Sequence, residues 1–277
     1  MTGNVINARF VWGANFKIQV MEDSVKAYRM SAQEFAPSVN DGVMLHGAGE
    51  QQAAIGTSPP VGTMAGEVLR RIDRTLLRPK SYERVKRLHD VIFSLSFMLV
   101  CGIWLFPIIA IAIKLDSRGP VFFNQARVGW KGRKFFCLKF RTMSYDPNAC
   151  FVQAQKDDPR VTRVGKFLRK TNLDELPQFI NVLKGEMSVV GPRPHVGELD
   201  LLHCDEVPGY KLRHLVRPGV TGLAQVSGCR GATQSLRDME HRIRFDLFYV
   251  RNMNFMLDIK IIALTVLRVL QGDTNAY

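Results

Sequence analysis

One long apolar stretch, Val91 to Ile113, interrupts the mixed polar and apolar pattern of the chain and contains no charged residue. As a helix it would be about 35 Å long at 1.5 Å per residue, enough to cross a hydrocarbon core of about 30 Å. The alternative is a buried helix of a soluble protein, but such helices seldom lack a polar stripe. The pattern therefore predicts a helix that inserts into a membrane.

The surroundings of this stretch favour a re-entrant helix, with a spanning helix as the alternative. Pro107 should break or kink the helix, and the arm before it, Val91 to Phe106, would be only about 24 Å long. Both ends are flanked by Lys and Arg, which favour the cytoplasmic side. We therefore expect both ends on the cytoplasmic side of the membrane. The flanking cations are Arg84, Lys86, Arg87, Lys114, Arg118 and Arg127.

The segments that follow are shorter and more polar. Two apolar runs flank Trp130-Lys131-Gly132, a turn signal, and predict a β-hairpin. The period of two puts Lys139 and Arg141 on one face of the second strand, either as solvated charges or as part of a site. The stretch "DPRVTRVGKFLRK" predicts a basic amphipathic helix that lies on anionic lipid or faces solvent. The apolar residues after Asp258 predict a core helix or a helix at the membrane surface.

Three regions follow from this pattern. Residues 1–80 are predicted to be a flexible N-terminal extension and linker, because glycines recur there and no Lys or Arg occurs between Ser31 and Leu69. A short strand is predicted at "NFKIQV". Residues 81–118 are the membrane-associated segment and residues 119–277 a mostly helical domain with the short hairpin. The predicted fold class is α+β.

Net charge narrows the range of partners. The chain carries a formal charge of +13 and has a pI near 9.8. This balance favours an anionic partner, which can be nucleic acid, a membrane surface or a phosphorylated substrate. The long apolar stretch argues against nucleic acid.

Two adjacent acids, Asp174 and Glu175, lie where a helix is predicted to begin, with Thr171 or Asn172 as its cap. This helix is expected to run through Pro177 to Lys184 and to stop at Gly185. Acids in a first turn stabilise the helix dipole, which is their ordinary role. The same end of a helix is also a binding site for phosphate.

Two rigid arginines strengthen the phosphate interpretation. Arg193 stands between Pro192 and Pro194 in "GPRP", and Arg217 stands in "RPGVTG". Arginines with little backbone freedom suit a bidentate grip on phosphate. A carboxylate among them is expected to have a lowered pKa. It could attack phosphorus or bind Mg²⁺.

These segments resemble the bacterial sugar transferase family, the polyprenyl-phosphate glycosyl-1-phosphate transferases. The similarity runs in unbroken order from about Lys86 to Tyr277 and is closest to the undecaprenyl-phosphate glucose phosphotransferase branch. It is carried by "KRLHD", "GPVFFNQARVG", "LKFRTM", "DPRVTRVGKFLRKTNLDELPQFINVLKGEMSVVGPRP", "VRPGVTGLAQVSG" and the late "DIK".

The resemblance implies a monotopic protein of the bacterial inner membrane, with a re-entrant helix broken at Pro107 and a small catalytic domain on the cytoplasmic face. It implies that Asp174 is the nucleophile and that Glu175 helps to hold Mg²⁺. The expected substrates are a UDP-hexose, glucose or galactose, and undecaprenyl phosphate, with UMP released. Contacts to the nucleotide or diphosphate are expected from Arg193 and Arg217, with Lys139 and Arg141 as weaker candidates.

Two departures and two open points accompany the resemblance. Phe106 stands where family members often have Ser, and the polar N-terminal region suggests a minimal form without preceding transmembrane helices. A membrane-anchored regulatory or scaffold protein of polysaccharide assembly is the alternative function. The oligomeric state is open, with a homodimer as one option.

Overall fold

Helices surround two separate two-stranded sheets, so the predicted α+β class is confirmed. The computed structural model describes residues 80–146, 158–229 and 235–271. The N-terminal linker and the strand predicted at "NFKIQV" lie outside these residues.

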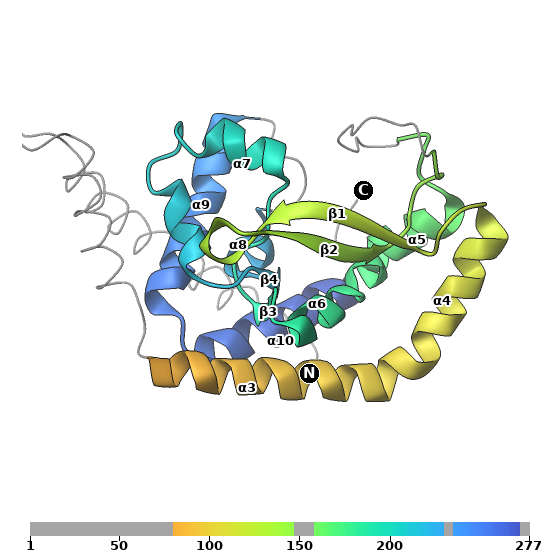
Figure 1. The fold of residues 1–277 in the computed structure, drawn as a ribbon, viewed down its shortest axis with the longest axis horizontal. Helices are drawn as coiled ribbons and strands as arrows, with labels where there is room; N and C mark the ends of the chain where they lie inside the picture. Colours follow the sequence, from red (N-terminus) through yellow and green to blue (C-terminus); the bar gives the residue numbers. More distant parts are fainter. Residues whose placement is uncertain (1–79, 147–157, 230–234, 272–277) are drawn as a thin grey trace, which may run out of the picture.

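A long bent helix runs along one edge of the molecule (Figure 1). It consists of α3 (Lys80–Phe97), a π-helical turn (Met98–Gly102) and α4 (Ile103–Asp116). It is the one helix of the described residues that is long and apolar enough to cross a membrane, with a mean hydropathy of 2.5 and 17% of its most apolar window buried. The helix predicted over Val91 to Ile113 is therefore confirmed, and its insertion into a membrane stays a prediction.

The long helix is bent but continues through Pro107 (Figure 1), which fits the predicted kink and not a full break. Pro107 lies inside α4, where its missing N–H removes one helical hydrogen bond. In the preceding π turn, the Ile103 N–H bonds to the Met98 carbonyl, a wider ring than in an α-helix. Two adjacent irregularities thus spread the change of direction over several residues.

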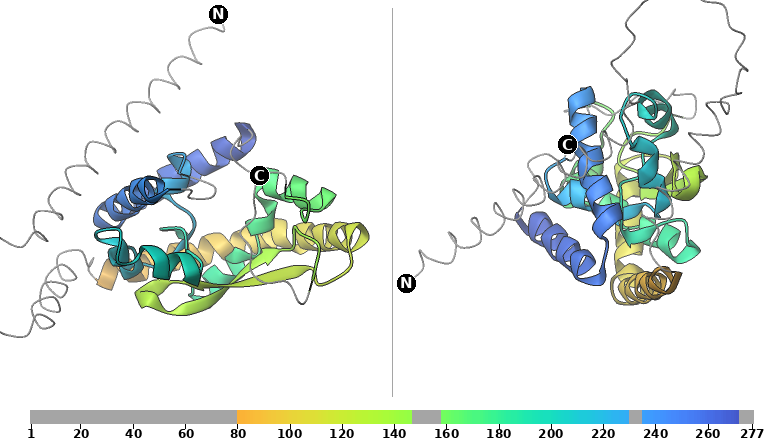
Figure 2. Two further views of the ribbon diagram at one scale, coloured as in Figure 1. Left: turned by 90° about the horizontal axis from the view of Figure 1, so that it is seen from above. Right: turned by 90° about the vertical axis from the view of Figure 1, so that its left-hand side faces the viewer.

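Buried polar contacts dock α3 on the rest of the fold. Lys86 Nζ lies 2.7 Å from the Asp258 carboxylate, which belongs to α10 (Phe255–Gln271). Figure 2 shows α10 beside α3. The buried Asp90 carboxylate accepts hydrogen bonds from Ser188 Oγ and the Val189 N–H, both 3.0 Å long. The distant motifs "KRLHD" and "DIK" therefore meet in one network.

The predicted hairpin is confirmed. Strands β1 (Phe122–Val128) and β2 (Lys134–Phe140) pair antiparallel, with Phe122 opposite Phe140, around the turn Trp130–Gly132. The second sheet is a parallel pair, β3 (Ser188–Val190) and β4 (Gly219–Thr221). The remaining α-helices of the described residues are α5 (Arg163–Thr171), α6 (Gln178–Lys184), α7 (Gly197–His203), α8 (Leu223–Val226) and α9 (Leu236–Asn252).

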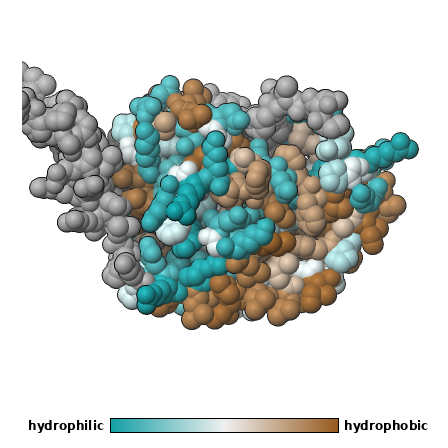
Figure 3. Space-filling model, viewed as in Figure 1, coloured by the Kyte–Doolittle hydropathy of each residue, from teal (hydrophilic) through white to brown (hydrophobic). Residues whose placement is uncertain are grey.

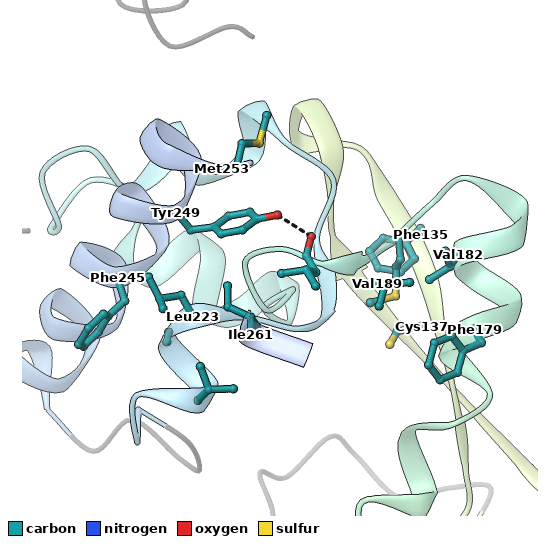
Figure 4. Packing of buried hydrophobic residues seen from close by; sticks show 14 residues of the cluster. Phe135, Cys137, Phe179, Val182, Val189, Leu223, Phe245, Tyr249, Met253 and Ile261 are labelled. Carbon is teal, nitrogen blue, oxygen red and sulfur yellow. Dashed lines mark hydrogen bonds between the residues drawn. The ribbon is translucent and has the colours of Figure 1, made fainter. Parts of the chain in front are cut away.

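The main core packs β2 and α6 against β3, α8, α9 and α10 (Figure 4). The Tyr249 hydroxyl of α9 crosses it to donate to the Val190 carbonyl at 3.0 Å, which fixes the end of β3. The predicted amphipathic helix is present as α5, and α10 is not long and apolar enough to count as a second membrane helix. Core side chains include Phe135, Cys137, Phe179, Val182, Val189, Leu223, Phe245, Tyr249 and Ile261.

Candidate functional site

The two acids lie in a separate 3-10 turn, Leu173–Glu175, and not in the first turn of a longer helix as predicted. Asn172 adopts the left-handed conformation, with φ of 60°, and ends α5 without capping a following helix. Asn tolerates this conformation better than most residues. The next helix, α6, begins only at Gln178, but it ends at Gly185 with φ of 88° as predicted.

Glu175 is fixed by two cations. Its Oε1 accepts hydrogen bonds from Lys139 Nζ at 2.8 Å and Arg193 Nη2 at 2.5 Å, and its Oε2 accepts one from Arg193 Nη1 at 3.1 Å. The residue is only 8% exposed. Burial alone would raise the pKa of this carboxyl, but Arg193 and Lys139 hold it well below its usual range. Glu175 is therefore ionised and tightly held.

Asp174, next to it, differs from Glu175 in its hydrogen bonding and in the direction of its pKa shift. No hydrogen bond joins its carboxylate to any other residue that the structure describes. Burial raises its pKa to about 6, and the nearby charges of Lys139, Arg193 and Arg169 only partly oppose this effect, to which Glu175 adds. The expectation of a lowered pKa is thus correct for Glu175 and wrong for Asp174, because Glu175 takes the hydrogen bonds of the cations.

Arg169 is a site residue that sequence reasoning missed. Its Nε donates to Thr142 Oγ1 at 2.9 Å. Burial lowers its pKa, and Asp174 is the largest of the charges that oppose this. The sequence offers several basic residues on α5, and only the packing of α5 against the 3-10 turn selects this one.

The "GPRP" loop follows the end of β3 and contacts the "RPGVTG" segment, which contains β4. Gly219 N donates to the Pro192 carbonyl at 2.9 Å. A Cβ on Gly191 would lie 2.4 Å from the Arg217 carbonyl, so the close approach requires glycine. The structure thus brings Arg193, which stands between Pro192 and Pro194, to Glu175.

The other two candidate arginines have different partners. Arg217 lies over the ring of Trp130, 4.3 Å from its centroid, and its Nε donates to the Gly185 carbonyl at 3.1 Å. Arg141 donates to the Arg118 and Ser117 carbonyls at 2.6 and 2.9 Å, and so holds the chain that leaves α4. Neither set of contacts includes the acid pair.

A small cavity lies behind the "GPRP" loop, against Val128, Gly129, Arg213 and His214. Its volume of about 10 Å³ is near that needed by one water molecule. It is too small for a nucleotide.

A helix compatible with membrane association, a half-buried carboxylate without a hydrogen bond to the described residues and a second carboxylate held by Arg and Lys fit the class of membrane-associated domains that act on anionic substrates. The comparison with known families makes this specific. The chain belongs to the bacterial sugar transferase family, which it matches over residues 81–272.

Relatives with assigned names support the same family. The UDP-glucose:undecaprenyl-phosphate glucose-1-phosphate transferase of Klebsiella pneumoniae is 52% identical over 184 residues, covering 66% of this chain and 39% of the relative. The protein of the same name from Xanthomonas campestris pv. campestris is 42% identical over 247 residues, covering 88% and 48%. The UDP-N-acetylgalactosamine-undecaprenyl-phosphate N-acetylgalactosaminephosphotransferase of Aeromonas hydrophila is 42% identical over 203 residues, covering 72% and 46%. The chain spans less than half the length of each of these relatives.

Proposed function

We propose that the protein transfers hexose 1-phosphate from a UDP-hexose to undecaprenyl phosphate, as an initiating step of polysaccharide repeat-unit synthesis. UDP-glucose is the first candidate donor, because the Klebsiella and Xanthomonas relatives are named for it, ahead of the galactose alternative. The observation that carries the proposal is the inequality of the acids: Glu175 is bound by Lys139 and Arg193, while Asp174 keeps its oxygens available.

The reaction proceeds in two displacements. A carboxylate oxygen of Asp174 attacks the phosphorus that bears the sugar, and the bond from this phosphorus to the UMP oxygen breaks. A phosphosugar-aspartyl enzyme forms. An oxygen of the lipid phosphate then attacks the same phosphorus, the bond to Asp174 breaks, and polyprenyl-diphosphate-hexose leaves. Fixed cations beside the acids offset the charge that gathers between two anionic reactants.

Mg²⁺ is the proposed cofactor, bound together with the nucleotide. The described residues contain no group of three His, Cys, Asp or Glu side chains that could hold a metal alone. Glu175 Oε2 accepts one hydrogen bond and keeps a lone pair, and Asp174 is free. One or two carboxylates plus substrate phosphates are ligands that Mg²⁺ accepts. When bound there, the ion would neutralise the diphosphate.

Exposed apolar side chains support membrane attachment through the bent helix. Brown apolar surface follows the lower edge of Figure 3, where α3 and α4 run in Figure 1. Arg163, Lys166 and Lys170 are exposed on α5, which packs on α4 through Leu168. These cations suit anionic lipid headgroups. Apolar side chains more than half exposed on the bent helix are Val85, Leu88, Ile92, Leu99, Val100, Ile103, Trp104, Ile108, Ile111 and Leu115.

The test of the activity is UMP release. Membranes that contain the protein are incubated with UDP-glucose, UDP-galactose or UDP-N-acetylgalactosamine, with undecaprenyl phosphate and Mg²⁺. We expect UMP and a lipid-linked sugar from at least one donor, and neither from Asp174→Asn. Full activity of Asp174→Asn would exclude this residue as the nucleophile. A membrane-anchored scaffold would release no UMP from any donor.

The test of the topology uses cysteines introduced at Ser81 and Arg118, one on each flank. A membrane-impermeant thiol reagent is added to intact cells and to opened vesicles. A re-entrant helix with both ends in the cytoplasm predicts labelling of both positions only after opening. Labelling of either position in intact cells would contradict it.

A further inference from the structure

The main chain around Arg193 is held at every carbonyl from Pro192 to His195. The Gly219 N–H donates to the Pro192 carbonyl at 2.9 Å, and the Val128 N–H donates to the His195 carbonyl at 3.1 Å. The two carbonyls between them are bound by side chains. A loop with prolines on both sides of Arg193 has little freedom left once these bonds form.

The two side-chain donors are arginines, one buried (Arg213) and one half-buried (Arg127). Arg213 Nη2 donates to the Arg193 carbonyl at 2.5 Å, and Arg127 Nη1 donates to the Pro194 carbonyl at 2.6 Å. Arg213 belongs to a 3-10 helix (Tyr210–Leu215), and Arg127 belongs to β1. Side chains from two elements that are far apart in sequence therefore donate hydrogen bonds to neighbouring carbonyls of one loop.

Each arginine is itself fixed. The Nε and Nη2 atoms of Arg213 donate to Asp246 Oδ2 at 3.1 and 2.8 Å, and both side chains of this ion pair are 2% exposed. The Tyr210 ring lies 5.4 Å from the Arg213 guanidinium. Arg127 donates to Gln125 Oε1 from Nη2 at 2.8 Å. Asp246 lies on α9, so a continuous series of contacts joins α9, Arg213, Arg193 and Glu175.

We propose that Arg127 and Arg213 are positioning residues of the transfer reaction. They bind the main-chain carbonyls of Arg193 and Pro194, and so orient the Arg193 guanidinium toward Glu175 and the reacting phosphates. Neither residue has a contact with the acid carboxylates in the structure, so they act through Arg193. The inference rests on the proposed function.

A double-mutant cycle on UMP release tests it. Arg213→Lys keeps the charge beside Asp246 but loses the fork that also reaches the Arg193 carbonyl. We expect kcat/KM to fall by about 10- to 100-fold, the effect of a small misplacement of a catalytic group. In an Arg193→Ala background, the same change should lower kcat/KM by less than about threefold, because the group that it positions is gone.

Arg141→Lys is the matched control. Arg141 is also a buried arginine whose two Nη atoms donate to main-chain carbonyls, but at the end of α4. Its effect, whatever its size, should be the same with and without Arg193. Thermal unfolding of each variant verifies folding, and Arg127→Lys takes the place of Arg213→Lys in the cycle if the latter does not fold.

The outcomes separate the two proposals. Equal fold losses from Arg213→Lys in both backgrounds, or unchanged activity of the single variant, would overturn the positioning role and leave the proposed function intact. Absence of UMP release from the unaltered protein with every donor would overturn the proposed function and this inference with it.

Discussion

Asp174 and Glu175 occupy one short turn, but their surroundings act on them in opposite directions. Glu175 has three hydrogen bonds from two cations, which stabilise its charged form. Asp174 is half-buried beside that charge, and its desolvation raises its pKa to about 6. A held carboxylate and an available one can therefore divide structural and nucleophilic roles, which identical surroundings would not permit.

Replacing each acid with its neutral amide should change the free energy of unfolding in opposite directions for Asp174 and Glu175. For Asp174, the rise of the pKa from 3.8 to about 6 means that the charged form is disfavoured in the folded state. Asp174→Asn should therefore raise the free energy of unfolding at pH 8 by about 1–3 kcal/mol. This gain should vanish below about pH 4, where Asp174 is protonated in both folded and unfolded states.

Glu175→Gln should have the opposite effect. It leaves the charges of Arg193 and Lys139 uncompensated, and we expect a loss of about 3 kcal/mol at pH 8. Denaturant unfolding in detergent at pH 8 and pH 4 measures both variants. A change of the same sign for the two amides at pH 8 would show that the acids are not held differently.

Lys139 should control the pH dependence of activity. Its charge is the largest of those that lower the pKa of Asp174, and Asp174 must be ionised to attack. We expect kcat/KM of the unaltered protein to fall as the pH drops through about 6. In Lys139→Gln the midpoint of this fall should move to higher pH, since the opposing charge is gone.

Lys131→Gln is the control for this profile, because Lys131 lies exposed at the hairpin turn over the ring of Trp130. Its acid limb should coincide with that of the unaltered protein. An acid limb of Lys139→Gln that stays in place or moves to lower pH would contradict the account of Asp174.

At the scale of elements, local signals were sufficient where the chain itself fixes the geometry. The Trp130–Gly132 turn gave the hairpin, and Gly185 ended α6 as expected. The 3-10 turn of the acids was not predicted, because the left-handed conformation of Asn172 ends α5 and separates the acids from α6. Asn can cap the start of a following helix, and in the left-handed conformation it can end a preceding one. Spacing in the sequence does not distinguish these two roles.

The attachment of α3 should depend on Asp90. Asp90→Ala removes the acceptor for the buried Val189 N–H and one acceptor for Ser188 Oγ, and we expect it to lower the free energy of unfolding by about 1–3 kcal/mol. Asp205→Ala is the control, because the Asp205–Lys211 pair is exposed and such pairs contribute little. Equal denaturation midpoints for the two variants would show that α3 is not held by this network.

At the scale of the whole molecule, the site depends on contacts that no sequence spacing encodes. Arg127, Arg169 and Arg213 come from β1, α5 and a later 3-10 helix, and tertiary packing alone brings them near Asp174 or Arg193. The sequence predicts Arg193 as a site residue because prolines flank it on both sides. The sequence around Arg217 is equally rigid, but its side chain lies over the Trp130 ring and donates to the Gly185 carbonyl.

The central claim is that Asp174 carries the sugar phosphate during transfer. Purified protein is incubated with Mg²⁺ and UDP-glucose labelled with ³²P in the β-phosphate, without lipid acceptor, then quenched in acid and digested for mass spectrometry. We expect label on the peptide that contains Asp174, one UMP released per labelled site, and loss of the label when undecaprenyl phosphate is added. Label of equal amount in Asp174→Asn, or transfer to lipid without any labelled protein, would contradict the account.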